Sequence, residues 1–143
     1  LLDAVIGSNN QYQKELKKQV EQRPGVRLHI QPESFTELML RADLCIGAGG
    51  TTTWERLCLN LPSLVVTVAA NQEEFTKDLD NDGYVKWVGR CHEITSDMMH
   101  AALFSMISNY SYKDRYFPQI VDGLGVDRVA EIVILTSTSV NYE

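Results

Sequence analysis

The sequence predicts an α/β fold in which parallel strands form a sheet that helices cover on both faces. Two observations lead to this prediction. Short apolar segments, typical of buried strands, alternate five times along the chain with segments of helical periodicity. The fourth apolar segment, "SLVVTVA", is apolar enough to be covered on both faces, as strands of parallel sheets commonly are.

The first part of the chain predicts two strands and two helices. Residues 1–6 are apolar and end at a glycine, and residues 26–30 alternate between apolar and polar side chains, so both are predicted strands. Residues 11–22 form a predicted surface helix whose buried stripe recurs every fourth residue, at Tyr12, Leu16 and Val20. Pro24-Gly25 ends that helix, and residues 34–42 after Pro32 predict a second, short helix.

The second part predicts three further strands, at residues 44–47, 63–69 and 84–88. Its predicted helices are residues 52–61, 72–80, 96–108 and 126–138. In the first of these helices, the apolar residues predicted to face the core are Trp54, Leu57, Cys58 and Leu61. Pro62 ends that helix.

Size, charge and cysteine content narrow the function classes. A chain of 143 residues fits one domain, and a net charge of −6 with a pI near 5.0 argues against a nucleic acid or membrane surface as partner. The three cysteines lack any paired spacing, and Cys45 and Cys58 are predicted to be buried thiols of a reducing compartment, so a cytoplasmic location is expected.

The chain opens directly on a predicted strand and without methionine. We therefore expect residues 1–143 to be a single ligand-binding domain excised from a longer two-domain chain. Residues 139–143 are expected to be a loose tail.

Three short polar loops follow predicted strands and precede predicted helices: "GSNN", "GAGGTTT" and "AANQEE". In a parallel sheet such loops meet at the carboxyl edge of the strands, where ligands bind. The second loop is the most informative, because its glycines allow backbone N–H groups to approach an oxyanion and a helix begins near Thr52. The loop is therefore predicted to bind an anion such as phosphate.

Each loop also has a purely structural interpretation. Thr52 and Glu55 match a capping box, in which each satisfies a donor at the helix start. Ser8 and Asn9 match helix caps, and Asn71 and Gln72 match either a cap or amides that bind sugar hydroxyls. A functional Glu55 should face sugar hydroxyls, because its carboxylate would repel phosphate. The sequence contains no cluster with zinc-ligand spacing, so no metal site is predicted.

The segments "VIGSNN", "FTELMLRADLCIGAGGTTTWERLCLNLPSLVV" and "ANQ" together resemble the C-terminal domain of the UDP-sugar hydrolase of pseudaminic acid biosynthesis. More distantly they resemble the C-terminal half of the peptidoglycan glycosyltransferase that uses UDP-N-acetylglucosamine. The resemblance covers about residues 5–90 and implies a Rossmann-like domain, the C-terminal half of a GT-B architecture.

The resemblance also implies roles for individual residues. Ser8 matches a diphosphate contact, Phe35 and Thr36 match a segment whose backbone reads the uracil edge, and Glu55 matches a ligand of the ribose hydroxyls. The stretch that matches the diphosphate loop is Gly49, Gly50, Thr51 and Thr52. Asn71 and Gln72 match amides near the sugar. Threonines stand at positions 51 and 53, where the family commonly has serines, and they keep the hydroxyl.

The implied function is the UDP-binding half of an enzyme that hydrolyses UDP-2,4-diacetamido-2,4,6-trideoxy-β-L-altropyranose. The family's catalytic histidine belongs to an N-terminal domain of the same chain, so no catalytic residue and no cofactor are expected here. The domain alone should be inactive, with UDP or a UDP-sugar as its ligand. The alternatives are the donor-binding domain of a UDP-sugar glycosyltransferase and a non-catalytic α/β interaction module.

Overall fold

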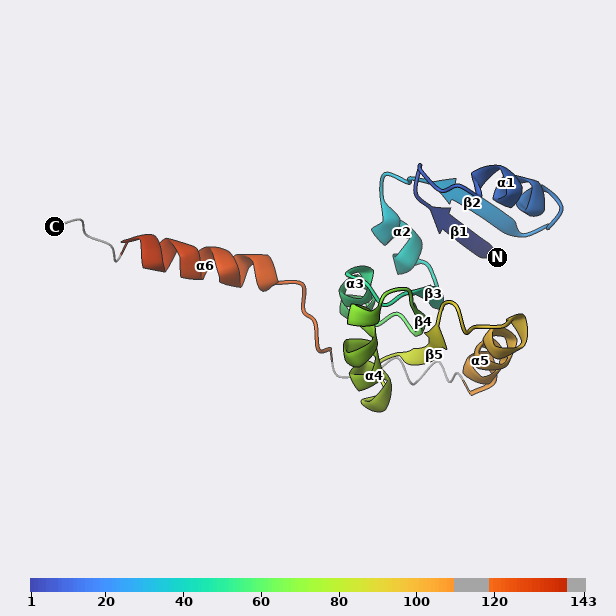
Figure 1. The fold of residues 1–143 in the computed structure, drawn as a ribbon. Coiled ribbons are helices and arrows are strands. Elements are labelled where there is room, and N and C mark those ends of the chain that lie inside the picture. The colour runs from blue at the N-terminus through green and yellow to red at the C-terminus, as the bar shows by residue number, and fades with distance from the viewer. Residues whose placement is uncertain (110–118, 139–143) are drawn as a thin grey trace. The chain divides into compact units, whose positions relative to one another are not determined.

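The computed structural model describes residues 1–109 and 119–138, and the chain divides into two compact units, Leu1–Arg41 and Ala42–Glu143. Each unit contains parallel strands and flanking helices, which confirms the predicted α/β class (Figure 1). Whether the chain acts as a single domain stays a prediction, and the predicted tail lies outside the described residues. None of the described helices is both long and apolar enough to cross a membrane.

The first unit is built on one parallel strand pair. Strand β1 (Leu2–Ile6) pairs with β2 (Val26–Ile30) in a register that sets Leu2 beside Val26 and Ile6 beside Ile30. Helix α1 (Gln13–Glu21) connects the two strands, and α2 (Phe35–Leu40) follows β2. Leu16 and Val20 of the predicted stripe are half-buried, whereas Tyr12 precedes the helix and is exposed.

Asp3 connects separate parts of this unit. His29 Nε2 lies 2.7 Å from its Oδ1, and Arg41 Nη2 donates to its Oδ2 at 3.1 Å. The hydrogen bond from His29 is the main reason that the pKa of Asp3 is lowered from its ordinary 3.8. One carboxylate on β1 thus holds a side chain of β2 and the residue that ends α2.

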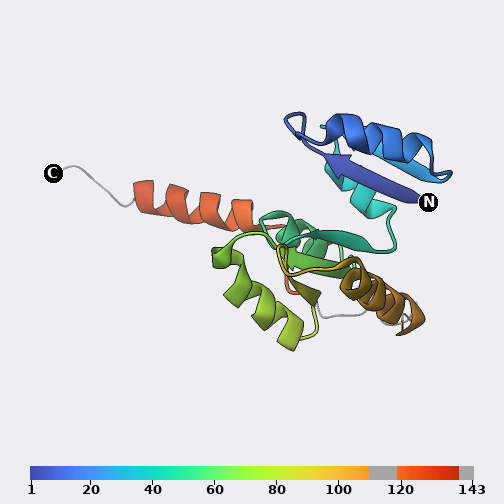
Figure 2. The same ribbon diagram turned by 45° about the vertical axis from the view of Figure 1, so that its right-hand side comes forward.

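The second unit contains a three-stranded parallel sheet in the order β3 (Cys45–Ala48), β4 (Ser63–Thr67), β5 (Lys86–Arg90). Its helical segments are α3 (Thr52–Cys58), the short 3₁₀ turn η1 (Ala70–Gln72), α4 (Glu73–Asn81), α5 (Ser96–Asn109) and α6 (Gly125–Thr138). Helices α4 and α5 lie on opposite sides of the sheet (Figures 1 and 2). The central strand is covered on both faces, as predicted, because Leu64 and Val65 are both fully buried.

The core of this unit joins α3, β4 and α4. Its buried apolar side chains, with the half-buried ones packed against them, are Leu57, Val65, Leu79, Val85, Phe75, Tyr84 and Val121. Burying one large aliphatic side chain contributes about 1.5–3 kcal/mol. This core fixes the central strand against the two helices that follow β3 and β4.

A β-bulge shifts the register between β4 and β5. Val65 pairs with Trp87, but Val66 pairs with Gly89, so Val88 is an extra residue. Gly89 has φ +141°, a conformation that side chains rarely adopt. The bulge brings Arg90 opposite Thr67 at the carboxyl end of β4.

Helix α3 differs from its prediction in length and in the face it buries. It ends at Cys58 rather than Leu61, and Asn60, two residues after its end, adopts φ +48°. The predicted core residue Trp54 is 46% exposed and lies against Phe75 of α4, with ring centroids 4.6 Å apart. The buried helix residues are instead Thr53, Arg56 and Leu57.

The predicted burial of two cysteines was also wrong. Cys45 and Cys58 are only half-buried, and Cys91 is exposed. All three thiols are free.

We predict that Asp3→Asn destabilises the protein at neutral pH and that this effect disappears in acid. Because the folded-state pKa is lowered, the carboxylate contributes fully above its ordinary pKa of 3.8 and loses its contribution as the pH falls through the lower folded value. Urea unfolding across the acid range measures the difference from wild type. Glu33→Gln, at an exposed residue with no ion pair among the described residues, is the control. A difference for Asp3→Asn that does not change with pH would contradict the prediction.

Candidate functional site

The loop between β3 and α3 presents three consecutive backbone N–H groups, those of Gly50, Thr51 and Thr52, that donate to no group in the described parts of the chain. On either side of them, the N–H of Gly49 donates to Val66 O at 3.2 Å and that of Thr53 to Gly50 O at 3.0 Å. Thr51 is exposed, and Gly50 and Thr52 are half-buried. Consecutive free amides in a turn form a binding site for an oxyanion.

The predicted capping box of Thr52 and Glu55 was wrong. The residue at the cap position is Thr51, which already has helical φ −58° and ψ −33°, and it makes no side-chain cap hydrogen bond. Thr52 therefore lies inside the helix. The carboxylate of Glu55 is exposed and forms no hydrogen bond or ion pair with the described residues. Its side chain remains available to a ligand.

Two glycines at the end of β3 serve internal packing. A Cβ on Gly47 would lie 2.2 Å from Arg56 Nη1, and a Cβ on Gly49 would lie 2.6 Å from Thr76 Oγ1. At Gly50 the nearest atom would be Gln72 Nε2, at 3.8 Å, which is ordinary contact. The glycines were expected to bring the backbone close to a ligand, and only at Gly50 does the structure leave room for that.

The side chain of Arg56 contacts both ends of the β3–α3 loop. The sequence did not indicate in which direction this side chain points. The side chain is 2% exposed, and its Nη2 donates to Ala48 O at 2.8 Å and to Thr53 Oγ1 at 2.9 Å. The available signal was spacing, because Thr53 and Arg56 are three residues apart and share a helix face. The loop is therefore supported by a buried guanidinium.

The loop after β4 supplies the predicted amides. Gln72 Oε1 accepts from Val68 N at 3.0 Å, and its Nε2 is the group nearest to the open side of Gly50. Gln72 stands at the cap position of α4 without making a side-chain cap bond, so the capping interpretation was wrong. Asn71 is exposed, with no side-chain partner in the described ranges. The structure thus brings Gln72 beside the glycine loop.

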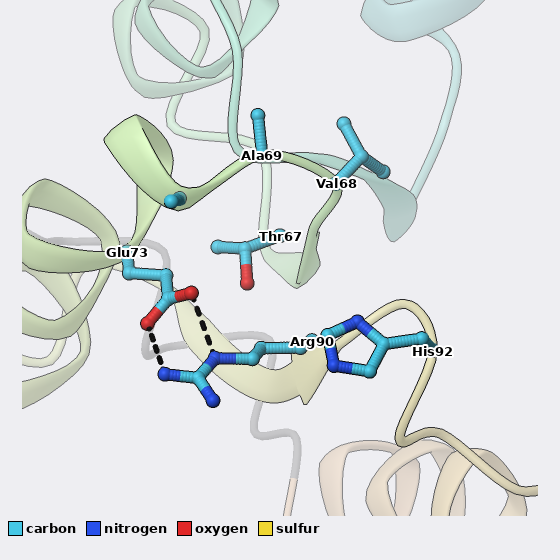
Figure 3. Close-up of a pocket in the computed structure, with 7 residues that line it drawn as sticks. Thr67, Val68, Ala69, Glu73, Arg90 and His92 are labelled. Carbon is cyan, nitrogen blue, oxygen red and sulfur yellow. Dashed lines mark hydrogen bonds and ion pairs between the residues drawn. The ribbon is translucent and has the colours of Figure 1, made fainter.

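A hollow of about 310 Å³ opens next to these amides, at the carboxyl ends of β4 and β5 (Figure 3). It is lined by Thr67, Val68, Ala69, Ala70, Glu73, Arg90 and His92. Arg90 donates to both oxygens of Glu73, at 2.7 and 2.8 Å, and these bonds hold the pKa of Glu73 below its ordinary value. The sequence did not predict this hollow, because the bulge in β5 that positions Arg90 leaves no clear pattern.

Ser8 lies in the first unit, in the loop between β1 and α1. Its backbone N–H lies 3.4 Å from Gln31 Oε1, and Gln31 has φ +47° directly after β2. The helix begins later than predicted, at Gln13, and Asn10 Oδ1 accepts from Tyr12 N at 2.8 Å. Ser8 and Asn9 are therefore not caps. Gln31 was missed, because a single glutamine carries no local signal for this contact.

Phe35 and Thr36 are the first two residues of α2. Ser34 caps this helix by accepting from the N–H of Glu37 at 3.3 Å. The N–H groups of Phe35 and Thr36 have no acceptor within the described ranges. Both amides thus remain open for an external acceptor.

We predict that Gly49→Ala destabilises the protein by about 1–3 kcal/mol, the usual cost of overpacking. The added methyl would meet Thr76 Oγ1, which already donates to Gln72 O at 2.6 Å. Urea unfolding measures the effect. Gly125→Ala is the matched control, because nothing lies within 4 Å of its Cβ position, and it should unfold like wild type. Equal stability of the two variants would contradict the close packing at Gly49.

Comparison with curated proteins finds a distant relative. The chain is 25% identical over 132 residues to the spore coat polysaccharide biosynthesis protein SpsG of Bacillus subtilis strain 168. The match covers 90% of this chain but spans only 39% of the length of SpsG. No protein-family model matches the chain, and no solved structure matches it. The chain is therefore related to part of a larger protein.

Proposed function

We propose that this chain binds the UDP moiety of a nucleotide sugar. The proposal depends on one observation: the N–H groups of Gly50, Thr51 and Thr52, at the carboxyl end of a parallel strand, have no acceptor in the described part of the chain. Ligands collect at this edge of α/β sheets. Three amides and the adjoining threonine hydroxyls suit a diphosphate, whose oxygens accept several hydrogen bonds.

The remaining residues receive roles that suit their exposure. Glu55 accepts hydrogen bonds from the ribose hydroxyls, because its carboxylate is exposed and unpaired in the described structure. From the resemblance alone, the open amides of Phe35 and Thr36 are proposed contacts of the base, and Ser8 is proposed as a phosphate contact; all three residues belong to the first unit. Asn71 and Gln72 lie toward the sugar. Gly49 shapes the loop through its packing.

We further propose that the chain is the nucleotide half of an enzyme of polysaccharide biosynthesis, which releases UDP from a diacetamido-trideoxy sugar. The similarity to SpsG, a spore coat polysaccharide biosynthesis protein, supports the pathway class, and the resemblance of the glycine loop supports the reaction. In the reaction, water attacks the anomeric carbon and UDP leaves. Loop amides that are already oriented stabilise the charge that develops on the leaving diphosphate. The catalytic group is assigned to a separate N-terminal domain, so this chain alone should bind the ligand without cleaving it.

Isothermal titration with UDP, UMP and uridine tests the binding proposal. UDP should bind most tightly and uridine most weakly, since each phosphate adds hydrogen bonds to the loop. The absence of heat with millimolar UDP would overturn the proposal. A protein that joins this chain to the N-terminal domain should then release UDP from the nucleotide sugar without any acceptor.

We predict that Glu55→Ala weakens UDP binding by roughly 10- to 100-fold, the usual effect of losing charge-assisted hydrogen bonds. The loss should be smaller for 2′-deoxy-UDP, which offers one hydroxyl fewer. Titration of both ligands into both proteins measures the coupling between the side chain and the hydroxyl. Glu131→Ala, at an exposed glutamate of α6, is the control and should bind like wild type. Equal losses for the two ligands would argue against the ribose role.

A further inference from the structure

Arg56 is a buried cation that has no carboxylate partner among the described residues. Its side chain is 2% exposed, and it forms no ion pair with the residues that the structure describes. Its Nε is buried and has no hydrogen-bond acceptor within the described ranges. Burying a charge is costly unless other groups compensate for it. The residue therefore requires an explanation that packing alone does not supply.

The contacts of Arg56 join the two ends of the glycine loop. Nη2 donates to Ala48 O at 2.8 Å, at the end of β3, and to Thr53 Oγ1 at 2.9 Å, in the first turn of α3. Thr53 Oγ1 in turn lies 3.4 Å from Ala48 O. The carbonyl that precedes the loop is thus bonded to a buried guanidinium, which offsets its negative partial charge.

Gly47 is the residue that makes room for this arrangement. A Cβ there would lie 2.2 Å from Nη1 and 3.2 Å from Cζ of Arg56. The guanidinium is therefore packed directly against the backbone of β3. The side chain of Arg56 thus bonds both ends of a loop whose amides at Gly50, Thr51 and Thr52 donate to no group in the described residues.

We propose that Arg56 is the positioning residue of the diphosphate loop and that its charge is compensated by the bound diphosphate. This inference rests on the proposed function, because it requires a UDP site at the loop. The guanidinium holds Ala48 O in a hydrogen bond, while the three amides that follow keep their N–H groups available in the described structure. Its positive charge then favours a dianionic or trianionic ligand over a neutral one, because buried charges are screened little by solvent.

The test compares Arg56→Met and Arg56→Lys with wild type, using uridine, UMP and UDP as ligands. Arg56→Met should bind UDP roughly 10- to 50-fold more weakly than wild type. This loss corresponds to the attraction between the guanidinium and one phosphate charge several ångströms away, at an effective dielectric constant near 20. The loss should be smaller for UMP, and uridine should bind within about twofold of wild type. Arg56→Lys keeps the charge but not the fork of donors, so it should restore part of the UDP affinity.

A second variant displaces Arg56 without removing it. Gly47→Ala should push the guanidinium away from β3 and lower UDP affinity while leaving uridine affinity unchanged. Gly125→Ala, which has open space at its Cβ position, is the matched control. Circular dichroism reports whether each variant folds. If Arg56→Met does not fold, the UDP affinity of Gly47→Ala tests the role of Arg56.

The outcomes separate this inference from the proposed function. A wild-type protein that binds none of the three ligands would overturn the proposed function, and the role of Arg56 with it. Two outcomes with a wild type that binds UDP would overturn only the role of Arg56. In one, the folded variants lose as much affinity for uridine as for UDP; in the other, they keep wild-type affinity for both. A graded loss from uridine to UDP, with partial rescue by lysine, supports it.

Discussion

The packing of the second unit depends on the close approach of the backbone at the end of β3 to side chains of α3 and α4. At Gly47 and Gly49 the backbone comes so near to Arg56 and Thr76 that neither position has room for a Cβ. These side chains belong to α3 and α4, so one short stretch of strand is held between two helices. Interiors packed at this density transmit small shifts rather than absorbing them. The direction in which the following loop leaves the sheet is set by this contact.

A set of buried polar side chains fills the space below the strand ends. Thr53, Thr67 and Thr76 are almost fully buried, and their hydroxyls lie within hydrogen-bond distance of Ala48 O, Gly89 O and Gln72 O. Ala48 ends β3, Gln72 ends η1, and Gly89 lies at the bulge one residue before the end of β5. These carbonyls are satisfied by side-chain donors, whereas the amides of Gly50, Thr51 and Thr52 in the β3–α3 loop have no acceptor among the described residues. The hydrogen-bonding groups that the carboxyl edge of the sheet offers thus depend on the buried threonines next to it.

Much of the fold could be predicted from the sequence, because hydrophobic period and turn residues act locally. Strand β2 was predicted at its observed bounds, Val26–Ile30, and every other strand and helix was predicted near its observed place. Helix caps were predicted poorly. Whether Thr51 or Thr52 begins α3 depends on a backbone angle that tertiary packing sets. The face of α3 was also misjudged, since apolarity favoured Trp54 over Arg56, whose burial depends on a glycine in another element.

The glycine loop was identified from sequence, but the way in which it is supported was not. Contacts such as that between Gly49 and Thr76, or between Ser8 and Gln31, join residues more than 20 positions apart. No local pattern encodes them. The hollow beside Arg90 likewise depends on an extra residue in β5 that only the strand pairing reveals.

The solitary carboxylate of Glu55 has a thermodynamic consequence. An exposed glutamate with no partner in the described structure keeps its full rotamer freedom. Fixing such a side chain on a ligand costs up to about 2 kcal/mol of conformational entropy. Any hydroxyl that it binds must therefore contribute enthalpy well beyond that cost. Recognition through this residue would be driven by enthalpy and opposed by entropy, whereas a capped glutamate would already have been ordered in the free protein.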